Sequence, residues 1–430
     1  MNKKIGVVGL WHLGCVLCAC WQKLNNSVVG FDYDVALIKK LNRGILPLFE
    51  PGLSETICQG LKKNSLKFSS DITSLAACDY VFLAYDTPVR DDDSSDTAIL
   101  EKVISDLCEA IKNETVIIVT SQLPVGFCRF LGTKLKEKKS NLELAYSPEN
   151  LRLGEAIRCY LNPGRIILGT ASREVEKKCY ELFSQIKTNI ISCSFESAEM
   201  IKHGINSFLA TSIVFANNLA DICEYVGADI DEVVRGIKSD PRIGEKAYLS
   251  AGIGFSGGTL GRDLVVLKQK NLEGGKTATL FDIVYSLNKQ RKLVIFQKIE
   301  KVLKKHQIKS PRIGIIGLTY KSGTSTLRRS VPLEIVNLLL EKKYEVKVYD
   351  PKADYTELDY IPAFEISNDI KEVTKHVDLI VLFTDWPEFK EYDWSNVAGH
   401  MRTPLVLDTK NFLSKQTMIS FGFNYYGVGR

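Results

Sequence analysis

Short apolar runs alternate with longer amphipathic stretches along most of the chain. Runs rich in valine, isoleucine and leucine predict buried strands, whereas apolar positions that recur about every 3.6 residues predict helices. The expected strands cover residues 4–8, 28–32, 80–84, 116–120, 312–316, 346–349, 379–383 and 405–407. Because strands that alternate with helical stretches form parallel sheets, the pattern predicts an α/β protein.

Two long helical stretches separate the first group of strands from the second. Residues 199–225 are rich in good helix formers and have a helical period. Residues 279–306 form another long predicted helix, which becomes basic toward its end. A coiled coil is not predicted there, because apolar heptads do not persist.

The first two expected strands flank a turn, Gly9 to Gly14, with the sequence G-L-W-H-L-G. A helix over residues 15–24 follows the turn, and Asp32 ends the second strand, at the spacing of about 20 residues that is typical of nucleotide-binding units. In such units, phosphates bind at the helix N-terminus and the acidic residue accepts hydrogen bonds from a ribose. The spacing therefore predicts a dinucleotide site.

Two details of this turn bear on the cofactor. Asp32 is followed by Tyr33 and Asp34 and not by arginine, which favours NAD over NADP. Trp11 occupies the place of the middle glycine, and we expect its side chain to lie along the cofactor. The residues expected to contact NAD here are Gly9, Trp11, Leu13, Gly14 and Asp32. A nucleotide-free βαβ fold is the alternative that this imperfect fingerprint leaves open.

Composition narrows the class of protein. A chain of 430 residues, 45% hydrophobic and 25% charged, is typical of a globular protein of two or three domains. A net charge of +5 suits an anionic small ligand, and no dense basic run with interleaved aromatic residues indicates nucleic-acid binding. The 11 cysteines and five histidines are scattered, so we expect reduced thiols, a cytoplasmic protein and no metal site. No apolar run reaches the ~18 residues of a membrane helix, so no membrane partner is expected.

Residues 252–263 have the sequence G-I-G-F-S-G-G-T-L-G-R-D, in which five of the twelve positions are glycine. Glycine allows positive φ angles and lets a ligand approach the backbone closely. By itself, this run predicts a tight loop that leads into a helix from Leu264 onward.

The same run resembles the active-site loop of the UDP-glucose/GDP-mannose dehydrogenases, which is G-x-G-F-G-G-S-C-F-x-K-D. Further segments are similar to that family: 41–53, which contains E-P-G-L; 121–126, S-Q-L-P-V-G against S-T-V-P-V-G; and 147–154, S-P-E-N-L-R-L-G against S-P-E-F-L-R-E-G. Strand ends in the C-terminal part also have counterparts in the family. The resemblance therefore covers about the whole chain.

This resemblance implies an α/β fold with two Rossmann-like doubly wound domains, joined by a central helical domain with a long connecting helix. Residues 1–195 would bind NAD, residues 196–306 would carry the active-site loop and form a homodimer, and residues 307–430 would bind the nucleotide sugar. The expected cofactor is NAD and the expected substrate is a UDP-sugar. The implied activity is oxidation of the sugar at C6, similar to UDP-glucose 6-dehydrogenase in polysaccharide biosynthesis.

The resemblance also implies roles for individual residues. The implied catalytic residues are Glu149, Lys202, Asn206, Thr259 and Asp263. Further implied cofactor contacts are Thr87, Gln122, Arg262 and Arg328. The implied substrate contacts are Asn150, Leu151, Arg242, Tyr248, Gly252, Phe255, Gly257 and Lys321. In the family, the counterpart of Arg242 reaches the site of the partner subunit. The lysine and asparagine are four residues apart, so they lie on one helix face, where the family's pair stabilises a developing oxyanion.

The chain departs from the family pattern where the chemistry is most demanding. Thr259 replaces the nucleophilic cysteine and Arg262 replaces the lysine, while Gln122 and Leu153 replace a threonine and a glutamate. In relatives with the full set, the cysteine captures the aldehyde, a second hydride transfer leaves a thioester, and water releases the acid. A threonine hydroxyl is scarcely ionised near neutral pH and is therefore a poor substitute.

Three functions are consistent with these residues. The first is a nucleotide-sugar oxidoreductase with altered chemistry, which transfers one hydride or oxidises the aldehyde through its hydrate. The second is the full four-electron dehydrogenase, in which another group replaces the cysteine. The third is a catalytically silent nucleotide-sugar-binding protein, which the presence of Lys202, Asn206 and Asp263 disfavours.

Overall fold

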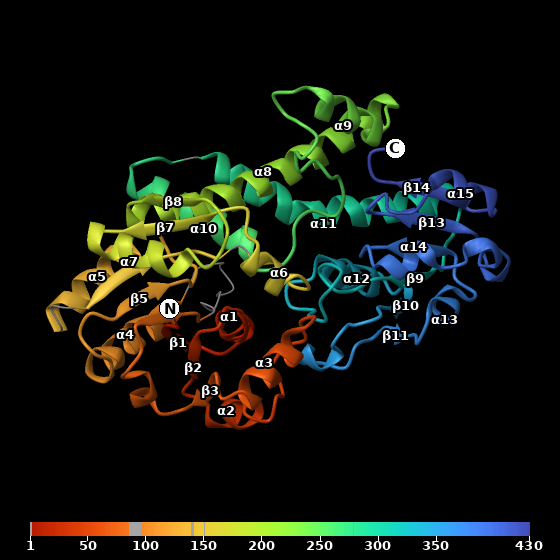
Figure 1. Cartoon of the computed structure of the whole chain (residues 1–430). Helices are drawn as coiled ribbons and strands as arrows, with labels where there is room; N and C mark the ends of the chain where they lie inside the picture. Colours follow the sequence, from red (N-terminus) through yellow and green to blue (C-terminus); the bar gives the residue numbers. More distant parts are fainter. Residues whose placement is uncertain (1, 86–95, 139–141, 150, 278) are drawn as a thin grey trace. The chain divides into compact units, whose positions relative to one another are not determined.

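The computed structural model describes residues 2–85, 96–138, 142–149, 151–277 and 279–430. Two of the predicted site residues, Thr87 and Asn150, lie outside the described residues. The chain divides into two compact units, Met1–Gly204 and Ile205–Arg430, which are called the first and the second unit below. Each unit contains one sheet with helices on both of its faces (Figure 1).

The sheet of the first unit has eight strands in the order β3-β2-β1-β4-β5-β6-β7-β8. Its neighbouring strands are parallel, except that β6 and β7 are antiparallel. The strands are β1 Lys4–Val8, β2 Ser27–Phe31, β3 Leu66–Ser69, β4 Tyr80–Leu83, β5 Val116–Val119, β6 Glu143–Tyr146, β7 Ile166–Thr170 and β8 Ile190–Cys193.

Helices cover both faces of this sheet because successive side chains of each strand point to opposite faces. Val7 of β1 belongs to a core cluster with α1 and α7, whereas Val8 belongs to a cluster with α4 and α5. The α-helices of this unit are α1 His12–Lys23, α2 Val35–Leu41, α3 Leu53–Lys62, α4 Ala98–Ala110, α5 Phe127–Lys138, α6 Ala156–Leu161 and α7 Arg173–Phe183, followed by the start of α8 Phe195–Val226.

The second unit contains a six-stranded, fully parallel sheet in the order β11-β10-β9-β12-β13-β14. Its strands are β9 Arg312–Ile316, β10 Glu345–Tyr349, β11 Glu365–Ile366, β12 Leu379–Leu382, β13 Leu405–Asp408 and β14 Asn424–Gly427. The helices after α8 are α9 Ile230–Ser239, α10 Thr259–Glu273, α11 Leu280–Lys305, α12 Val331–Glu341, α13 Ile370–Thr374, α14 Pro387–Glu391 and α15 Lys415–Ser420. Ile315 and Ile316 point into core clusters on opposite faces, so this sheet is also covered on both sides.

The predicted fold class is confirmed, and two helices begin earlier than expected. Helix α1 begins at His12 and not at residue 15, and α10 begins at Thr259 and not at residue 264. The two long helices match closely, and α11 begins with a capping box in which Thr279 and Asp282 bond each other's backbone N–H groups. The expected domain boundaries at residues 195 and 306 stay a prediction. Over the described part of the chain, no helix combines the length and the apolar character needed to cross a membrane.

Candidate active site

The turn between β1 and α1 is built on two glycines. Gly9 has a φ of +91°, and a Cβ added there would lie 2.9 Å from the backbone nitrogen of Tyr85. Gly14 lies inside α1, where an added Cβ would lie 1.8 Å from the carbonyl oxygen of Gly9. Both positions therefore require glycine, and the backbone passes close beneath the N-terminus of α1.

Asp32 lies directly after β2 and is fixed to this turn. Its Oδ2 accepts a hydrogen bond from Leu10 N at 2.8 Å, and its Oδ1 accepts one from Asp34 N at 3.1 Å. A carboxylate has about four acceptor positions, so acceptor capacity remains for ribose hydroxyls. Trp11, half exposed, is the N-cap residue of α1. The glycine turn, the helix N-terminus and the carboxylate together fit the phosphates and a ribose of NAD.

The first turns of α8 hold the loop that carries Gln122. Glu199 is fully buried and accepts hydrogen bonds from Gly126 N at 2.6 Å and from Cys128 N at 2.8 Å. Burial raises the pKa of Glu199 above its ordinary value. His203 donates Nε2–H to the carbonyl oxygen of Leu123 at 2.7 Å, since a carbonyl can only accept. Glu199 and His203 were not predicted from the sequence, although both are within one helical turn of Lys202.

Lys202, Glu149 and Leu151 lie together in the first unit. Lys202 is buried, and its Nζ donates to the carbonyl oxygen of Glu149 at 2.5 Å. The same Nζ is 4.0 Å from Oε1 of the Glu149 carboxylate, which also accepts a hydrogen bond from Leu151 N. The structure therefore joins a predicted catalytic carboxylate, a predicted oxyanion partner and a predicted substrate contact in one cluster.

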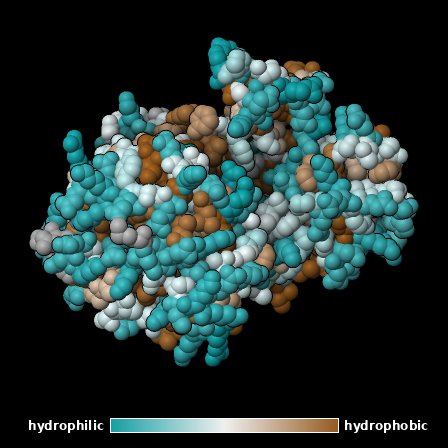
Figure 2. Space-filling view, viewed as in Figure 1, coloured by the Kyte–Doolittle hydropathy of each residue, from teal (hydrophilic) through white to brown (hydrophobic). Residues whose placement is uncertain are grey.

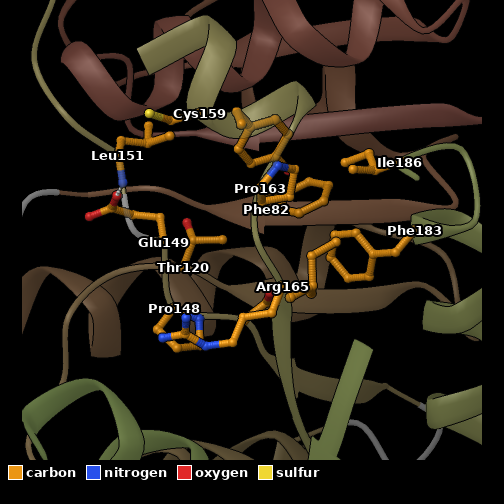
Figure 3. A pocket seen from close by; sticks show the side chains of 13 residues that line it. Phe82, Thr120, Pro148, Glu149, Leu151, Cys159, Pro163, Arg165, Phe183 and Ile186 are labelled. Carbon is orange, nitrogen blue, oxygen red and sulfur yellow. Dashed lines mark hydrogen bonds between the residues drawn. The ribbon is translucent and has the colours of Figure 1, made fainter. Parts of the chain in front are cut away.

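A small cavity of about 60 Å³ lies beside this cluster. Glu149, Leu151 and Thr120 line one end of it, and Phe183 and Ile186 line the other (Figure 3). The cavity is far smaller than typical small-molecule sites, which measure roughly 300–1,000 Å³. It therefore does not hold the sugar nucleotide, although it brings free space next to the Glu149 carboxylate.

In the second unit, Asn206 and Asp263 are hydrogen bonded. Asn206 Nδ2 donates to Asp263 Oδ2 at 2.5 Å, and both side chains are buried. Helix α10 places Asp263 one turn after Thr259, so the two residues share a helix face. Thr259 is exposed at the first position of this helix, whereas Arg262 is buried.

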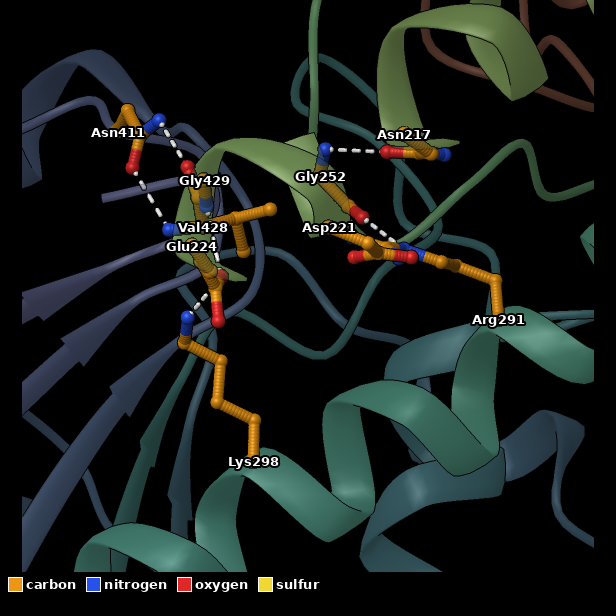
Figure 4. Close-up of polar contacts among 9 residues, drawn as sticks. All are labelled: Asn217, Asp221, Glu224, Gly252, Arg291, Lys298, Asn411, Val428 and Gly429. Atoms are coloured by element: carbon orange, nitrogen blue, oxygen red, sulfur yellow. Dashed lines mark hydrogen bonds and ion pairs between the residues drawn. The ribbon is translucent and has the colours of Figure 1, made fainter. Parts of the chain in front are cut away.

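The loop before α10 is anchored at Gly252 by α8 and α11. Gly252 N donates to Asn217 Oδ1 at 2.7 Å, and Arg291 Nε donates to the Gly252 carbonyl oxygen at 2.8 Å (Figure 4). The Nη1 of Arg291 also bonds both carboxylate oxygens of Asp221, at 2.6 and 2.7 Å. These contacts fix the start of the loop and the orientation of the guanidinium group.

The middle of the loop is held by Asn288 and by a tyrosine ring. Asn288 Oδ1 accepts from Phe255 N at 2.8 Å, and Asn288 Nδ2 donates to the Phe255 carbonyl oxygen at 2.9 Å. Gly257 has a φ of +78°, and a Cβ added there would lie 3.3 Å from the ring of Tyr320. The sequence analysis missed Asn217, Asn288 and Arg291, which contact the loop from far along the chain.

The remaining predicted site residues of the second unit are Arg242, Tyr248, Lys321 and Arg328. Arg242 is exposed and pairs with Asp240 at 2.6 Å, and Tyr248 is also exposed. Among the described residues, no hydrogen bond joins either side chain to the loop. Arg328 is exposed. Lys321 Nζ lies 5.8 Å from the centroid of the Tyr320 ring, the same ring that an added Cβ at Gly257 would approach.

Comparison with protein families finds three matching domain models, all of the UDP-glucose/GDP-mannose dehydrogenase family. The NAD binding domain matches residues 3–187, the central domain matches residues 196–290, and the UDP binding domain matches residues 314–415. The three matches follow the chain in this order, and the first contains the glycine turn and Asp32.

Whole-length relatives agree with these matches. The chain is 32% identical to the UDP-glucose 6-dehydrogenase of Rickettsia felis, covering 99% of this chain and 96% of the relative. It is 32% identical to the UDP-glucose 6-dehydrogenase TuaD of Bacillus subtilis, covering 100% and 93%. Among solved structures, a UDP-D-ManNAc dehydrogenase from Pyrococcus horikoshii is similar, with a TM-score of 0.88, 25% identity and 99% coverage of both chains.

Proposed function

Since the chain belongs to the UDP-glucose/GDP-mannose dehydrogenase family and has that family's NAD binding domain, we propose that it oxidises the C6 hydroxyl of a UDP-sugar without a covalent enzyme intermediate. The family places the chain among NAD-dependent oxidoreductases of nucleotide sugars. The match to a UDP binding domain and the names of the relatives support a UDP-sugar as substrate. The position of Thr259 is the observation on which the altered chemistry rests.

Thr259 begins α10, and a helix N-terminus stabilises a negative charge. A cysteine there would gain from this field, because helix N-termini lower thiol pKa values into the range where the thiolate forms. A threonine hydroxyl lies too far from ionisation for the same field to produce a nucleophile near neutral pH. The site therefore keeps a feature that would favour a thiolate but lacks the thiol.

The first oxidation needs groups that this chain retains. Lys202 and Asn206 lie one turn apart on α8, where they would stabilise the alkoxide that forms as the C6 hydroxyl loses its proton. Asp263 holds Asn206 through its buried hydrogen bond, and Glu149, whose Oε1 is 4.0 Å from Lys202 Nζ, could accept the proton. When bound, NAD supplies the hydride acceptor.

A second oxidation without a thiol would pass through the aldehyde hydrate. Water adds to the aldehyde carbon, one of the two resulting hydroxyls loses a proton, and the carbon then has a hydride to give. The free space beside Glu149 supports this step, because it would admit water next to a carboxylate. With Leu153 and Gln122 in place of the family's polar residues, we expect this step to be slow, so that the aldehyde or its hydrate accumulates.

Two other functions compete with this proposal. The full four-electron reaction through a covalent intermediate would need another protein nucleophile, yet Cys223, the only cysteine from residue 205 onward, lies on α8 and is buried in the core. In the first unit, burial raises the pKa of Cys15, Cys20 and Cys179 to about 12, which disfavours their thiolates. A catalytically silent binding protein is disfavoured by the buried Asn206–Asp263 pair.

A panel of UDP-, GDP-, CDP- and dTDP-sugars with NAD, followed by mass spectrometry of the products, tests the proposed function. We expect NADH formation with a UDP-sugar and an aldehyde or hydrate among the products. Lys202→Ala should lower the initial rate at least about a hundredfold, as loss of an oxyanion partner does, whereas Thr259→Ala and Thr259→Ser should have small effects. Loss of all NADH production in Thr259→Ala, with substrate still bound, would support the four-electron alternative.

We further propose that two copies of the chain assemble through α8. Phe208, Phe215 and Ile222 recur every seventh residue on this helix and are 70%, 50% and 57% exposed. Apolar patches interrupt the hydrophilic surface where Figure 1 labels α8 and α11 (Figure 2). Such a stripe would bury its apolar area against an identical helix. Phe215→Asp should yield monomers by light scattering; a variant that remains as large as the unaltered protein would contradict this interface.

A further inference from the structure

One buried carboxylate joins three segments of the first unit. The side chain of Glu50 is 1% exposed, and its Oε2 accepts hydrogen bonds from His12 Nε2 at 2.9 Å and Gly154 N at 3.0 Å. Its Oε1 accepts a third hydrogen bond from Ala156 N at 2.8 Å. Three donors converge on its two oxygens, so the Glu50 carboxylate acts here only as an acceptor.

Two of these segments are those that the cofactor and the substrate would use. His12 is the first residue of α1, directly after the glycine turn. Gly154 and Ala156 follow Glu149 in the sequence, and Ala156 is the first residue of α6. Helix α1 packs against both α3 and α6, and Glu50 lies just before α3 (Figure 1). The carboxylate therefore ties the cofactor turn to the segment that carries a predicted catalytic residue.

This arrangement puts a buried negative charge close to an expected anion site. The N-terminus of α1 is where the phosphates of NAD bind in such a fold. His12 is the first residue of that helix, and its imidazole Nε2 is hydrogen bonded to the Glu50 carboxylate. A buried charge is weakly screened, so an uncompensated carboxylate here would repel the pyrophosphate. Because Nε2 faces an acceptor, it carries the proton and directs its dipole at the carboxylate.

We propose that His12 and Glu50 are a positioning pair for the cofactor, in which His12 shields the pyrophosphate from the Glu50 charge while Glu50 fixes Gly154 and Ala156 against α1. The pair acts through its hydrogen bond and needs no contact with the substrate. This inference concerns cofactor binding and holds whichever chemistry occurs at Thr259. Its test can therefore fail or succeed independently of the proposed oxidation without a covalent intermediate.

A double-mutant cycle on NADH affinity, measured by fluorescence titration of the full chain, tests the shield. His12→Ala should raise the NADH Kd on the order of tenfold, as expected for a nearby charge that has lost its compensating partner. Adding Glu50→Gln removes the charge, so the double variant should regain most of this affinity. His12→Gln, which keeps an N–H donor, should bind NADH close to normally.

Glu155→Gln is the matched control. It removes one carboxylate from the same segment, but that side chain is exposed and paired with Arg158, so the NADH Kd should not change. Circular dichroism of each apo variant confirms that it is folded before titration. A purely structural role predicts that the double variant is weaker than either single variant. A double variant that binds NADH no better than His12→Ala, or a His12→Gln variant as weak as His12→Ala, would overturn the proposal.

Discussion

Replacing Asn288 with alanine tests whether side-chain hydrogen bonds determine the conformation of the loop before α10. Asn288 forms two hydrogen bonds with the backbone of Phe255, and both residues are buried. The alanine variant leaves the N–H and the C=O of Phe255 without these partners. An unsatisfied buried polar group costs about 1–3 kcal/mol, so two such groups should lower the free energy of unfolding by about 2–6 kcal/mol.

The change should also alter substrate binding, because Phe255 and Gly257 are proposed substrate contacts. We expect a higher KM for the sugar nucleotide with little change in NADH affinity, since the cofactor turn lies in the other unit. Asn288→Asp should be intermediate in stability, because it keeps the acceptor for Phe255 N but loses the donor for the carbonyl oxygen.

Urea unfolding and steady-state kinetics measure the two effects. Asn218→Ala serves as the control, since within the described part of the chain Asn218 Nδ2 donates only to the carbonyl oxygen of Val214, which lies four residues earlier on the same helix. We expect that control to change the free energy of unfolding by less than about 1 kcal/mol. The reasoning would be refuted if Asn288→Ala unfolded at the same urea concentration as the control and kept an unchanged KM.

Asp32→Ala should weaken NAD binding by about 1–3 kcal/mol through the loss of hydrogen bonds to a charged group; equal use of NADP by the unaltered protein would contradict the assigned role. The hydrogen bonds from Arg129 hold the pKa of Glu196 at about 2, so this pair stabilises the fold above the unfolded pKa of about 4.3, and its contribution is lost as the pH falls toward 2. Because the pair is exposed, Glu196→Gln should lower the free energy of unfolding by less than about 1 kcal/mol at pH 7. The difference in unfolding free energy between this variant and the unaltered protein should shrink as the pH falls from about 4.3 to about 2. A difference that grew on acidification would contradict this.

Each of the eight strands predicted from the sequence overlaps an observed strand, whereas β3, β6, β7, β8, β11 and β14 were not predicted. Buried parallel strands are continuous apolar runs, and the expected ranges 4–8 and 312–316 coincide with β1 and β9. Helices α1 and α10 begin earlier than predicted because both contain an interior glycine, which local propensity disfavours. In α1, tertiary packing overrides that propensity, since only glycine at position 14 lets the Gly9 carbonyl approach.

The site was predictable where its residues are close in sequence and not where they are distant. Asp32 follows the turn at a spacing that a βαβ unit dictates, and Leu10 N bonds its carboxylate as expected for that layout. Asn288 is 33 positions from Phe255, and Glu50 is 104 positions from Gly154. Bonds from a side chain to a remote backbone group leave no periodic pattern in the sequence, so only the folded structure reveals them.

The central claim is that Thr259 does not act as a nucleophile, and the NADH formed per UDP-sugar consumed tests it most directly. The count is made in excess NAD for the unaltered protein and for Thr259→Ala, with mass spectrometry of the product. Our account predicts the same count and the same product for both proteins, because neither forms a covalent intermediate. A fall from two NADH per sugar to one, or to none with substrate still bound, in Thr259→Ala alone would contradict it.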